Sequence, residues 1–186
     1  MREAPVREEE RVSEDVTVRR IDVDEAEARI EALADVLIDC VEGGASVSFM
    51  RPLPRSKAIA FWRDVADAVA RHERVLLIAE DATGQLLGTV QLIVSLPDNQ
   101  PHRADVAKML VRRSARRRGV AHRLMVALDE AAHQEGRTVL VLDTVTGGDA
   151  ERLYQRAGWQ RVGVVPKYAL MPDGEFCATT FFYKHL

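Results

Sequence analysis

The stretch Asp105–Leu128, DVAKMLVRRSARRRGVAHRLMVAL, decides how the rest of the chain must fold. It begins with an apolar run typical of a strand, passes through an arginine-rich loop with one glycine, and ends in a helical pattern. Apolar residues recur in this last part at helical spacing and form one face: Val120, Leu124, Leu128 and Ala131. A strand that leads directly into a helix leaves the first N–H groups of the helix without partners at one point.

The loop between this strand and helix has the features of a pyrophosphate site. The helix dipole makes the N-terminus electropositive, and Arg116, Arg117 and Arg118 add formal charge beside it. Gly119 lacks the Cβ that would keep a ligand away from the backbone. The five arginines between residues 112 and 118 also suit a nucleic-acid surface, but no aromatic residue interleaves them, which disfavours that alternative.

Composition narrows the class of protein further. A length of 186 residues suits one domain, expected over residues 16–186 after a flexible acidic tail at 1–15. A net charge of −3 argues against nucleic acid as the main partner, and no apolar run reaches the length of a membrane span or the form of a signal peptide. We therefore expect a cytoplasmic protein without a membrane or nucleic-acid partner, as a monomer or homodimer.

Cysteine and histidine placement gives no sign of a metal. Cys40 and Cys177 have neither metal-ligand spacing nor a disulfide framework, so we expect two buried thiols in a reducing compartment. The five histidines form no triad or ligand cluster in the sequence, and no metal is expected.

The order of elements predicts a mixed α/β sheet of about seven strands flanked by four helices. Strands are expected at 16–21, 74–81, 86–96, 106–111, 138–143, 160–165 and 176–184. Helices are expected from about residue 26 to Gly43-Gly44, at 56–72, from Val120, and from Ala150 with Asp149 as its cap. The continuous apolar run Thr138–Asp143 predicts a strand covered on both faces. Asp143 is expected at its C-terminal end, where open α/β sheets bind their ligands.

Two segments carry a resemblance to a known family. Arg116–Ala121, RRRGVA, resembles the Q/R-x-x-G-x-G/A signature of the GNAT N-acetyltransferases, and Ala150–Trp159, AERLYQRAGW, resembles their A-x-x-L-Y-x-x-x-G-F segment. Trp159 stands where the family usually has phenylalanine. The resemblance covers nearly everything from residue 16 onward and implies the acyl-CoA N-acyltransferase (GNAT) fold.

The resemblance also implies a donor and a set of roles. Acetyl-CoA would be the cosubstrate, held by the strand edge and the loop: Met109, Leu110, Val111, Arg116, Arg117, Arg118, Gly119, Val120 and Ala121. An N–H at Met109 or Leu110 would stabilise the oxyanion, and Tyr154 would protonate the leaving thiolate. Asp105 is the first choice as general base, acting through water because it is shorter than the family's glutamate. Asp143 is the second choice, and either carboxylate could instead attract the charge of the acceptor.

Scattered pieces resemble the tabtoxin-resistance acetyltransferases, which acetylate the amine of a β-lactam toxin. They are Glu42–Met50, Arg103–Met125, Leu142–Thr144 and Arg161–Gly174. The likeness implies that a small amine is the acceptor and that the loop Gly43–Met50 binds it through Gly43, Gly44, Ser46 and Phe49. The same loop could instead be pinned to the core by Phe49. A protein or peptide N-acetyltransferase and a non-catalytic CoA-binding module are the alternative functions.

Overall fold

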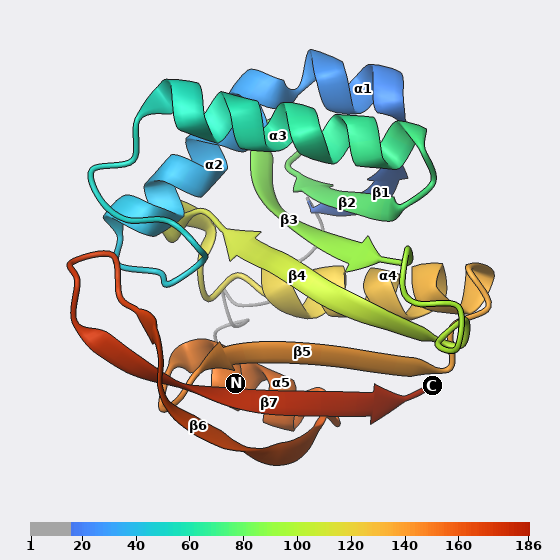
Figure 1. Ribbon diagram of the computed structural model, residues 1–186. Helices are drawn as coiled ribbons and strands as arrows, with labels where there is room; N and C mark the ends of the chain where they lie inside the picture. Colours follow the sequence, from blue (N-terminus) through green and yellow to red (C-terminus); the bar gives the residue numbers. More distant parts are fainter. Residues whose placement is uncertain (1–15) are drawn as a thin grey trace, which may run out of the picture.

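The computed structural model describes residues 16–186, so the tail expected at 1–15 lies outside the described residues. One seven-stranded sheet has the strand order β1-β2-β3-β4-β5-β7-β6 and carries helices on both faces (Figure 1). Its elements are β1 (Thr17–Ile21), α1 (Val23–Ala28), α2 (Ile30–Glu42), α3 (Arg55–Ala70), β2 (Arg74–Glu80), β3 (Leu86–Ile93), β4 (Arg103–Val111), the short 3-10 turn η2 (Arg113–Ala115), α4 (Val120–Gln134), β5 (Val139–Val145), α5 (Asp149–Arg156), β6 (Gln160–Leu170) and β7 (Phe176–His185). The mixed α/β sheet predicted from the order of elements is confirmed.

The described chain has five α-helices where four were expected, because the first predicted helix is broken at Arg29. Arg29 ends α1 and precedes α2 with non-helical backbone angles. Its guanidinium reaches Glu80 Oε1 at 2.5 Å and the Gly84 carbonyl at 3.1 Å, which ties the break to the β2–β3 hairpin. Apolar periodicity runs through both pieces and therefore does not reveal the break.

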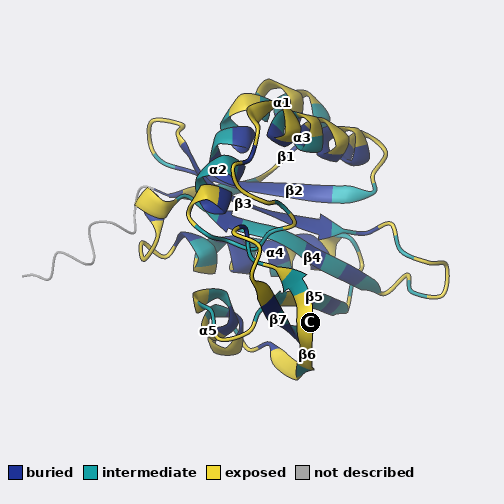
Figure 2. Ribbon diagram, turned by 60° about the vertical axis from the view of Figure 1, so that its left-hand side comes forward, coloured by how far each residue is buried: buried dark blue, intermediate teal, exposed yellow. Residues whose placement is uncertain are grey.

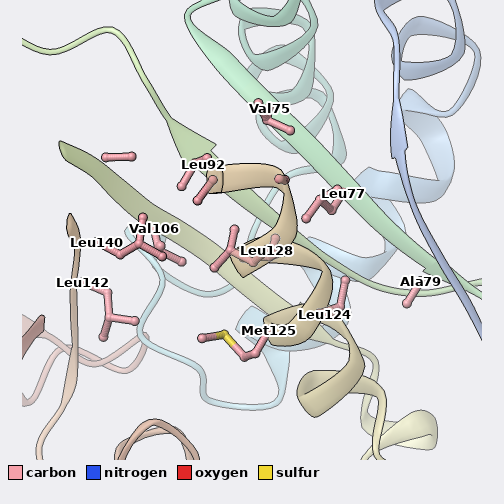
Figure 3. Close-up of a cluster of buried hydrophobic side chains, with 14 of the residues drawn as sticks. Val75, Leu77, Ala79, Leu92, Val106, Leu124, Met125, Leu128, Leu140 and Leu142 are labelled. Atoms are coloured by element: carbon pink, nitrogen blue, oxygen red, sulfur yellow. The ribbon is translucent and has the colours of Figure 1, made fainter. Parts of the chain in front are cut away.

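Each face of the sheet packs against its own helices. On one face Leu124, Met125 and Leu128 of α4 lie over apolar residues of the central strands, among them Leu77, Val106, Leu140 and Leu142 (Figure 3). On the other face α1, α2 and α3 bury Trp62, Leu33 and Leu37 against Leu76, Ile78 and Leu110. Successive residues of β2 alternate between these two cores, so that this strand is buried on both faces.

The prediction that the Thr138–Asp143 strand is covered on both faces is wrong. Only Leu140 and Leu142 of β5 are buried; Val141 is half-buried and Asp143 is exposed. The reason is that the α1–α3 core takes its strand residues from β1 to β4 and none from β5. Strand β5 also continues to Val145, so Asp143 lies within the strand and not at its end.

Strands β4 and β5 run parallel but stay paired only over Arg103–Asp105 and Val139–Val141. Beyond that point β4 bulges, because Leu110 pairs with Thr89 while Ala107 pairs with Gln91. The extra residue is accommodated at Lys108, whose φ is +51°. A bulge bends its strand and adds twist, and β4 accordingly separates from β5 toward their C-terminal ends (Figure 1). The edge of β4 that faces β5 is left open over Val106–Val111.

Two local expectations near the chain's end need correction. Strand β6 extends to Leu170, beyond the predicted end at Val165, and its hairpin with β7 meets the loop after α2. Asp149 is the first residue of α5 and not its cap, because Gly148 holds that position without a side-chain bond. Glu151 instead accepts a hydrogen bond from the Gly147 N–H.

None of the helices in the described chain combines the length and apolar content that crossing a bilayer requires.

Candidate active site

The loop after β4 leaves the N-terminus of α4 open. Gly119 precedes α4 in the left-handed region (φ +76°), and no side chain caps the helix. A Cβ at Gly119 would meet no atom within 4 Å, so the space beside the first turn is free of protein atoms. Arg117 also has positive φ (+61°), which turns successive peptide groups within the loop. These features fit the diphosphate of a nucleotide thioester, because unpaired helix-terminal N–H groups bind anions.

The arginines of this loop divide into two groups. Arg112 donates from Nε to the Leu86 carbonyl at 2.8 Å, and Arg113 donates from its backbone N and from Nε to Asp39 at 2.7 and 2.9 Å. These two arginines attach the loop to β3 and α2. The other three, Arg116, Arg117 and Arg118, are exposed and form no ion pair within residues 16–186. Arg116 acts on the Cys40 thiol, however, and Arg118 acts on Asp81.

Asp39 and Gly43, near the end of α2, support the loop at residues 112–119, which is called the phosphate loop from here on. A Cβ at Gly43 would lie 2.6 Å from Arg113 Cδ, so glycine is what lets Arg113 pack here and reach Asp39. Gly43 was predicted to bind the acceptor, and the structure places it beside the phosphate loop. Asp39 was missed, because an acidic residue in an amphipathic helix is typical of a solvent-exposed face.

The loop after Gly44 joins the core to the β6–β7 hairpin. Phe49 packs edge-to-face on Phe61 of α3 with centroids 5.3 Å apart, so Phe49 does pin the loop to the core. Ser46 donates from Oγ to the Leu170 carbonyl at 2.9 Å, at the end of β6. Ser48 Oγ lies 3.0 Å from Lys108 Nζ, which donates to it from the β4 bulge. The structure therefore brings this loop to the site, with Ser48 as its contact with β4.

On β4 the side chains pack into the two cores, and the peptide groups of Val106–Val111 face the opening between β4 and β5. Leu110 is buried in the α1–α3 core, while Met109 and Val111 pack against the α4 core. What the open edge of β4 offers to a ligand is therefore its row of peptide groups. Val120 is buried beneath the helix start and packs in the α4 core.

Tyr154 of α5 is only 5% exposed. Its ring packs on Trp159 and Phe182, with centroids 5.9 and 6.1 Å away. Burial, and secondarily the charge of Asp143, raise the pKa of Tyr154 above its ordinary value. The phenol is therefore protonated at neutral pH, as a proton donor must be.

The two candidate carboxylates share one face of the sheet. Asp105 pairs across the ladder with Ile93 on one side and Val141 on the other, and Asp143 follows Val141 by two residues. Asp105 is bound to Arg103, which also holds Gln100. Asp143 has no ion pair among residues 16–186. Its side chain reaches solvent, but the protein around it removes enough water for partial desolvation to raise its pKa; the charge of Lys108 opposes that shift, and Asp105 adds to it. The two aspartates thus lie near each other, but in the described part of the chain Asp105 is held in an ion pair with Arg103 and Asp143 is not.

Lys108 is another charged group of this region that the sequence analysis did not predict. Its Nζ lies 5.6 Å from the centroid of Phe61, and burial lowers the pKa of Lys108, with Arg74 lowering it further and Asp143 opposing. In the sequence, Lys108 interrupts an apolar run as a solvent-facing strand residue would. Only the bulge turns this side chain toward α3 and the loop at Ser48.

The cysteines are buried free thiols, as predicted. Cys40 donates from Sγ to the Val111 carbonyl at 3.4 Å, and burial raises the pKa of Cys40, so it packs as a neutral thiol beneath the phosphate loop. Within residues 16–186, no three His, Cys, Asp or Glu side chains are grouped as metal ligands would be.

Comparison with known proteins identifies the family of this chain. The model of the acetyltransferase (GNAT) domain matches residues 71–161. An uncharacterized N-acetyltransferase of Azospirillum brasilense, encoded between hisH and hisA, is 33% identical over 131 residues, which are 69% of this chain and 75% of that protein. The chain belongs to the GNAT family. Family membership makes it an acetyl-CoA-dependent N-acetyltransferase.

Solved structures share the GNAT fold across almost the whole chain. An acetyltransferase structure from Salmonella typhimurium, solved with its cofactor acetyl-CoA, has a TM-score of 0.75 at 18% identity and covers 92% of this chain and 94% of that one. A ribosomal-protein-alanine N-acetyltransferase from Brucella melitensis has the same TM-score at 21% identity, with coverage of 91% and 99%. At these identities the likeness establishes the fold of the GNAT chain and leaves its acceptor open.

Proposed function

We propose that this GNAT enzyme transfers the acetyl group of acetyl-CoA directly to the primary amine of a small molecule, such as an amine-bearing toxin or antibiotic. The observation that carries the proposal is the separation of β4 from β5. One end of the open β4 edge leads into the uncapped start of α4, and Asp143 lies on the facing strand. Tyr154, whose pKa responds to Asp143, completes the set. In this proposal the donor-binding groups, the base Asp143 and the acid Tyr154 all line one seam, the gap that opens between β4 and β5.

The donor is held mainly by backbone groups in this proposal. The first N–H groups of α4 and the exposed Arg116–Arg118 side chains bind the diphosphate, and the β4 edge bonds to the pantetheine amides. An N–H at Met109 or Leu110 stabilises the oxyanion of the thioester carbonyl, a contribution of ~10²–10³ in rate for one donor.

We assign the general base to Asp143 in preference to Asp105. A base works best when its pKa lies near the working pH, and burial moves the pKa of Asp143 in that direction. Asp105 is already bound by the Arg103 guanidinium. Asp143 takes a proton from the acceptor ammonium, and the freed amine attacks the thioester carbonyl. The N–C bond forms first and gives a tetrahedral oxyanion, whose collapse breaks the C–S bond; the second proton of the nitrogen replaces the proton that Tyr154 gives to the thiolate.

Tyr154 supplies the second proton transfer. Its hydroxyl protonates the departing thiolate, a general-acid role worth ~10²–10⁴ in rate. Tyr154 is protonated at neutral pH, as a donor must be; its raised pKa makes the phenol a weaker acid, which the high basicity of a departing alkyl thiolate has to overcome.

Contacts between two loops favour a small acceptor over a polypeptide. The β6–β7 hairpin is held to the loop after α2 by Ser46 to the Leu170 carbonyl, by Arg51 N to the Pro172 carbonyl at 3.1 Å, and by Arg51 to Asp173 at 3.3 Å. A peptide lying across the site would have to pass these contacts. The protein or peptide N-acetyltransferase is therefore the second choice.

The test is release of free thiol from acetyl-CoA in the presence of amino acids, polyamines, aminoglycosides and β-lactam amines. We expect release with at least one small amine, and a loss of ~10²–10⁴ in kcat for Tyr154→Phe. Tight CoA binding without thiol release from any small amine or peptide would replace the proposal with a non-catalytic CoA-binding module. Release with peptides alone would favour the protein acceptor.

A further inference from the structure

A row of charged side chains crosses the face of the sheet that carries Asp143. The ladder aligns Arg74 of β2 with Ile93, Ile93 with Asp105, and Asp105 with Val141. Residues two apart on a strand share a face, so Gln91 and Asp143 lie on the same side as this row. Lys108 joins them from the bulge, because its charge acts on both Asp143 and Arg74.

Two cations of this region, Arg74 and Lys108, have no carboxylate partner in an ion pair of the described chain. Arg103 is bound to Asp105, and Glu73, which acts electrostatically on Arg74, is bound to Arg71 at 2.9 Å. Within residues 16–186 neither Arg74 nor Lys108 forms an ion pair. Arg74 donates instead to Gln91 Oε1 at 2.5 Å, and Lys108 donates to Ser48 Oγ.

Keeping these two cations half-buried and unpaired costs free energy. Burial lowers the pKa of both Arg74 and Lys108, and the nearby carboxylates of Glu73 and Asp143 offset this loss of hydration only in part. The amide nitrogen of Gln91 adds a third unfilled donor, since the residue is fully buried and its Nε2 has no partner in the described chain. Buried donors and cations are normally satisfied, so this combination indicates a ligand with acceptor oxygens.

We propose that Lys108 and Arg74 bind a carboxylate of the acceptor, which makes the acceptor a zwitterion of the amino-acid class with its amine at Asp143. The inference rests on the proposed function and specifies its substrate. In the ladder Arg74 lies on β2 and Asp143 on β5, and Lys108 comes from the bulge of the intervening strand β4, so it can lie between the two ends of such a molecule. Phe61, which lies under Lys108 and against Phe49, provides an apolar surface beside it. Gln91 is a positioning residue that holds Arg74.

The first test needs only the unaltered enzyme. Each amino acid that releases thiol is compared with its α-amide, which keeps the amine and side chain and removes the negative charge. We expect kcat/KM to be about tenfold or more higher for the acid, the effect of one charge-assisted hydrogen bond. Equal kcat/KM for acid and amide across the panel would overturn the inference and leave the acetyltransferase function intact.

Two variants locate the carboxylate site. Lys108→Met and Arg74→Met should each reduce the preference for the acid over the amide, chiefly through KM for the acid, while Lys108→Arg should restore most of it. Arg63→Met is the matched control, because Arg63 is an exposed cation of α3 outside the row. If both Met variants kept the full preference, the carboxylate would be bound elsewhere and the inference would fail.

A binding measurement separates this inference from the proposed function. In the presence of CoA, the acid should raise the melting temperature of the unaltered protein more than the amide does, and neither Met variant should show the difference. No thiol release with any amine would overturn the proposed function, and this thermal shift would then decide the carboxylate site by itself. Equal shifts for acid and amide would refute it.

Discussion

The two halves of the sheet are built differently. Strands β1 to β4 lie between α1–α3 on one face and α4 on the other, and the residues of β2 and β3 are nearly all buried. Strands β5 and β7 contribute to the α4 core only, and β6 is largely exposed (Figure 2). The side chain of Val162 on β6 is 67% exposed. The site lies where these halves separate, between β4 and β5.

The difference suggests a division of labour. The covered half carries the bulge, the phosphate loop and the cations of the row, all of which need fixed positions to bind a donor and an acceptor. The open half contributes the proposed proton-transfer groups Asp143 and Tyr154, and no helix core of the described residues covers the face that carries Asp143. Changes in the covered half should therefore affect binding or folding, and changes on the open face of the other half should affect chemistry or nothing.

The largest effect is expected for Gly119→Glu. The new carboxylate would stand at the uncapped start of α4, where it repels a diphosphate, and any side chain is strained at φ +76°. CoA binding by calorimetry should fall below detection. Gly136→Glu is the matched control, since Gly136 also has positive φ (+68°) and open space but follows the other end of α4. Equal CoA affinity in both variants would refute the assignment of the diphosphate to the start of α4.

Asp143→Asn should come next, with a loss of ~10²–10⁴ in kcat/KM if Asp143 is the base. Because the base must be ionised and burial raises the pKa of Asp143, activity should fall as pH decreases, at a higher pH than for an ordinary aspartate. The variant should lose this acidic limb of the pH–rate profile. Asp105→Asn serves as the comparison, and if it alone abolished the limb, the two roles would be reversed.

The halves should also differ in stability. Leu124 of α4 is fully buried in the covered half, so Leu124→Ala should lower the free energy of unfolding by about 2–5 kcal/mol. Val162→Ala on the exposed face of β6 should change it by less than about 0.5 kcal/mol. Urea denaturation measures both. A loss at Val162 similar to that at Leu124 would mean that β6 is covered in solution, for example by a second copy of the chain.

Sequence reasoning succeeded where local pattern and structure coincide. The apolar stripe from Val120 onward and the glycine before it predicted α4 and its open N-terminus, because both depend on neighbouring residues alone. Strand β6 was predicted too short, since Pro166 and Lys167 interrupt its pattern. In the structure these residues fall within a register shift between Val165 and Ala169, after which pairing with β7 resumes.

The parts of the site that escaped prediction depend on strand pairing. Lys108 faces α3 only because β4 bulges against β3, and the exposure of Asp143 follows from the absence of β5 from the α1–α3 core. Arg74 and Asp143 are 69 positions apart in sequence, and only the ladder through Ile93 and Asp105 brings them onto one face. A single sequence contains no local signal for either relation.

The smallest predicted effect tests the coupling across the seam. The charge of Lys108 lowers the pKa of Asp143, so Lys108→Met should raise that pKa and move the acidic limb of kcat to higher pH. The base would then be protonated over a wider range, and activity at the acidic end would decline while the alkaline plateau changes less. The measurement is kcat at saturating acceptor as a function of pH, with Lys108→Arg as the control that keeps the charge. A limb that stays in place, or moves to lower pH, would mean that Lys108 in the covered half does not act on the ionisation of Asp143 in the open half.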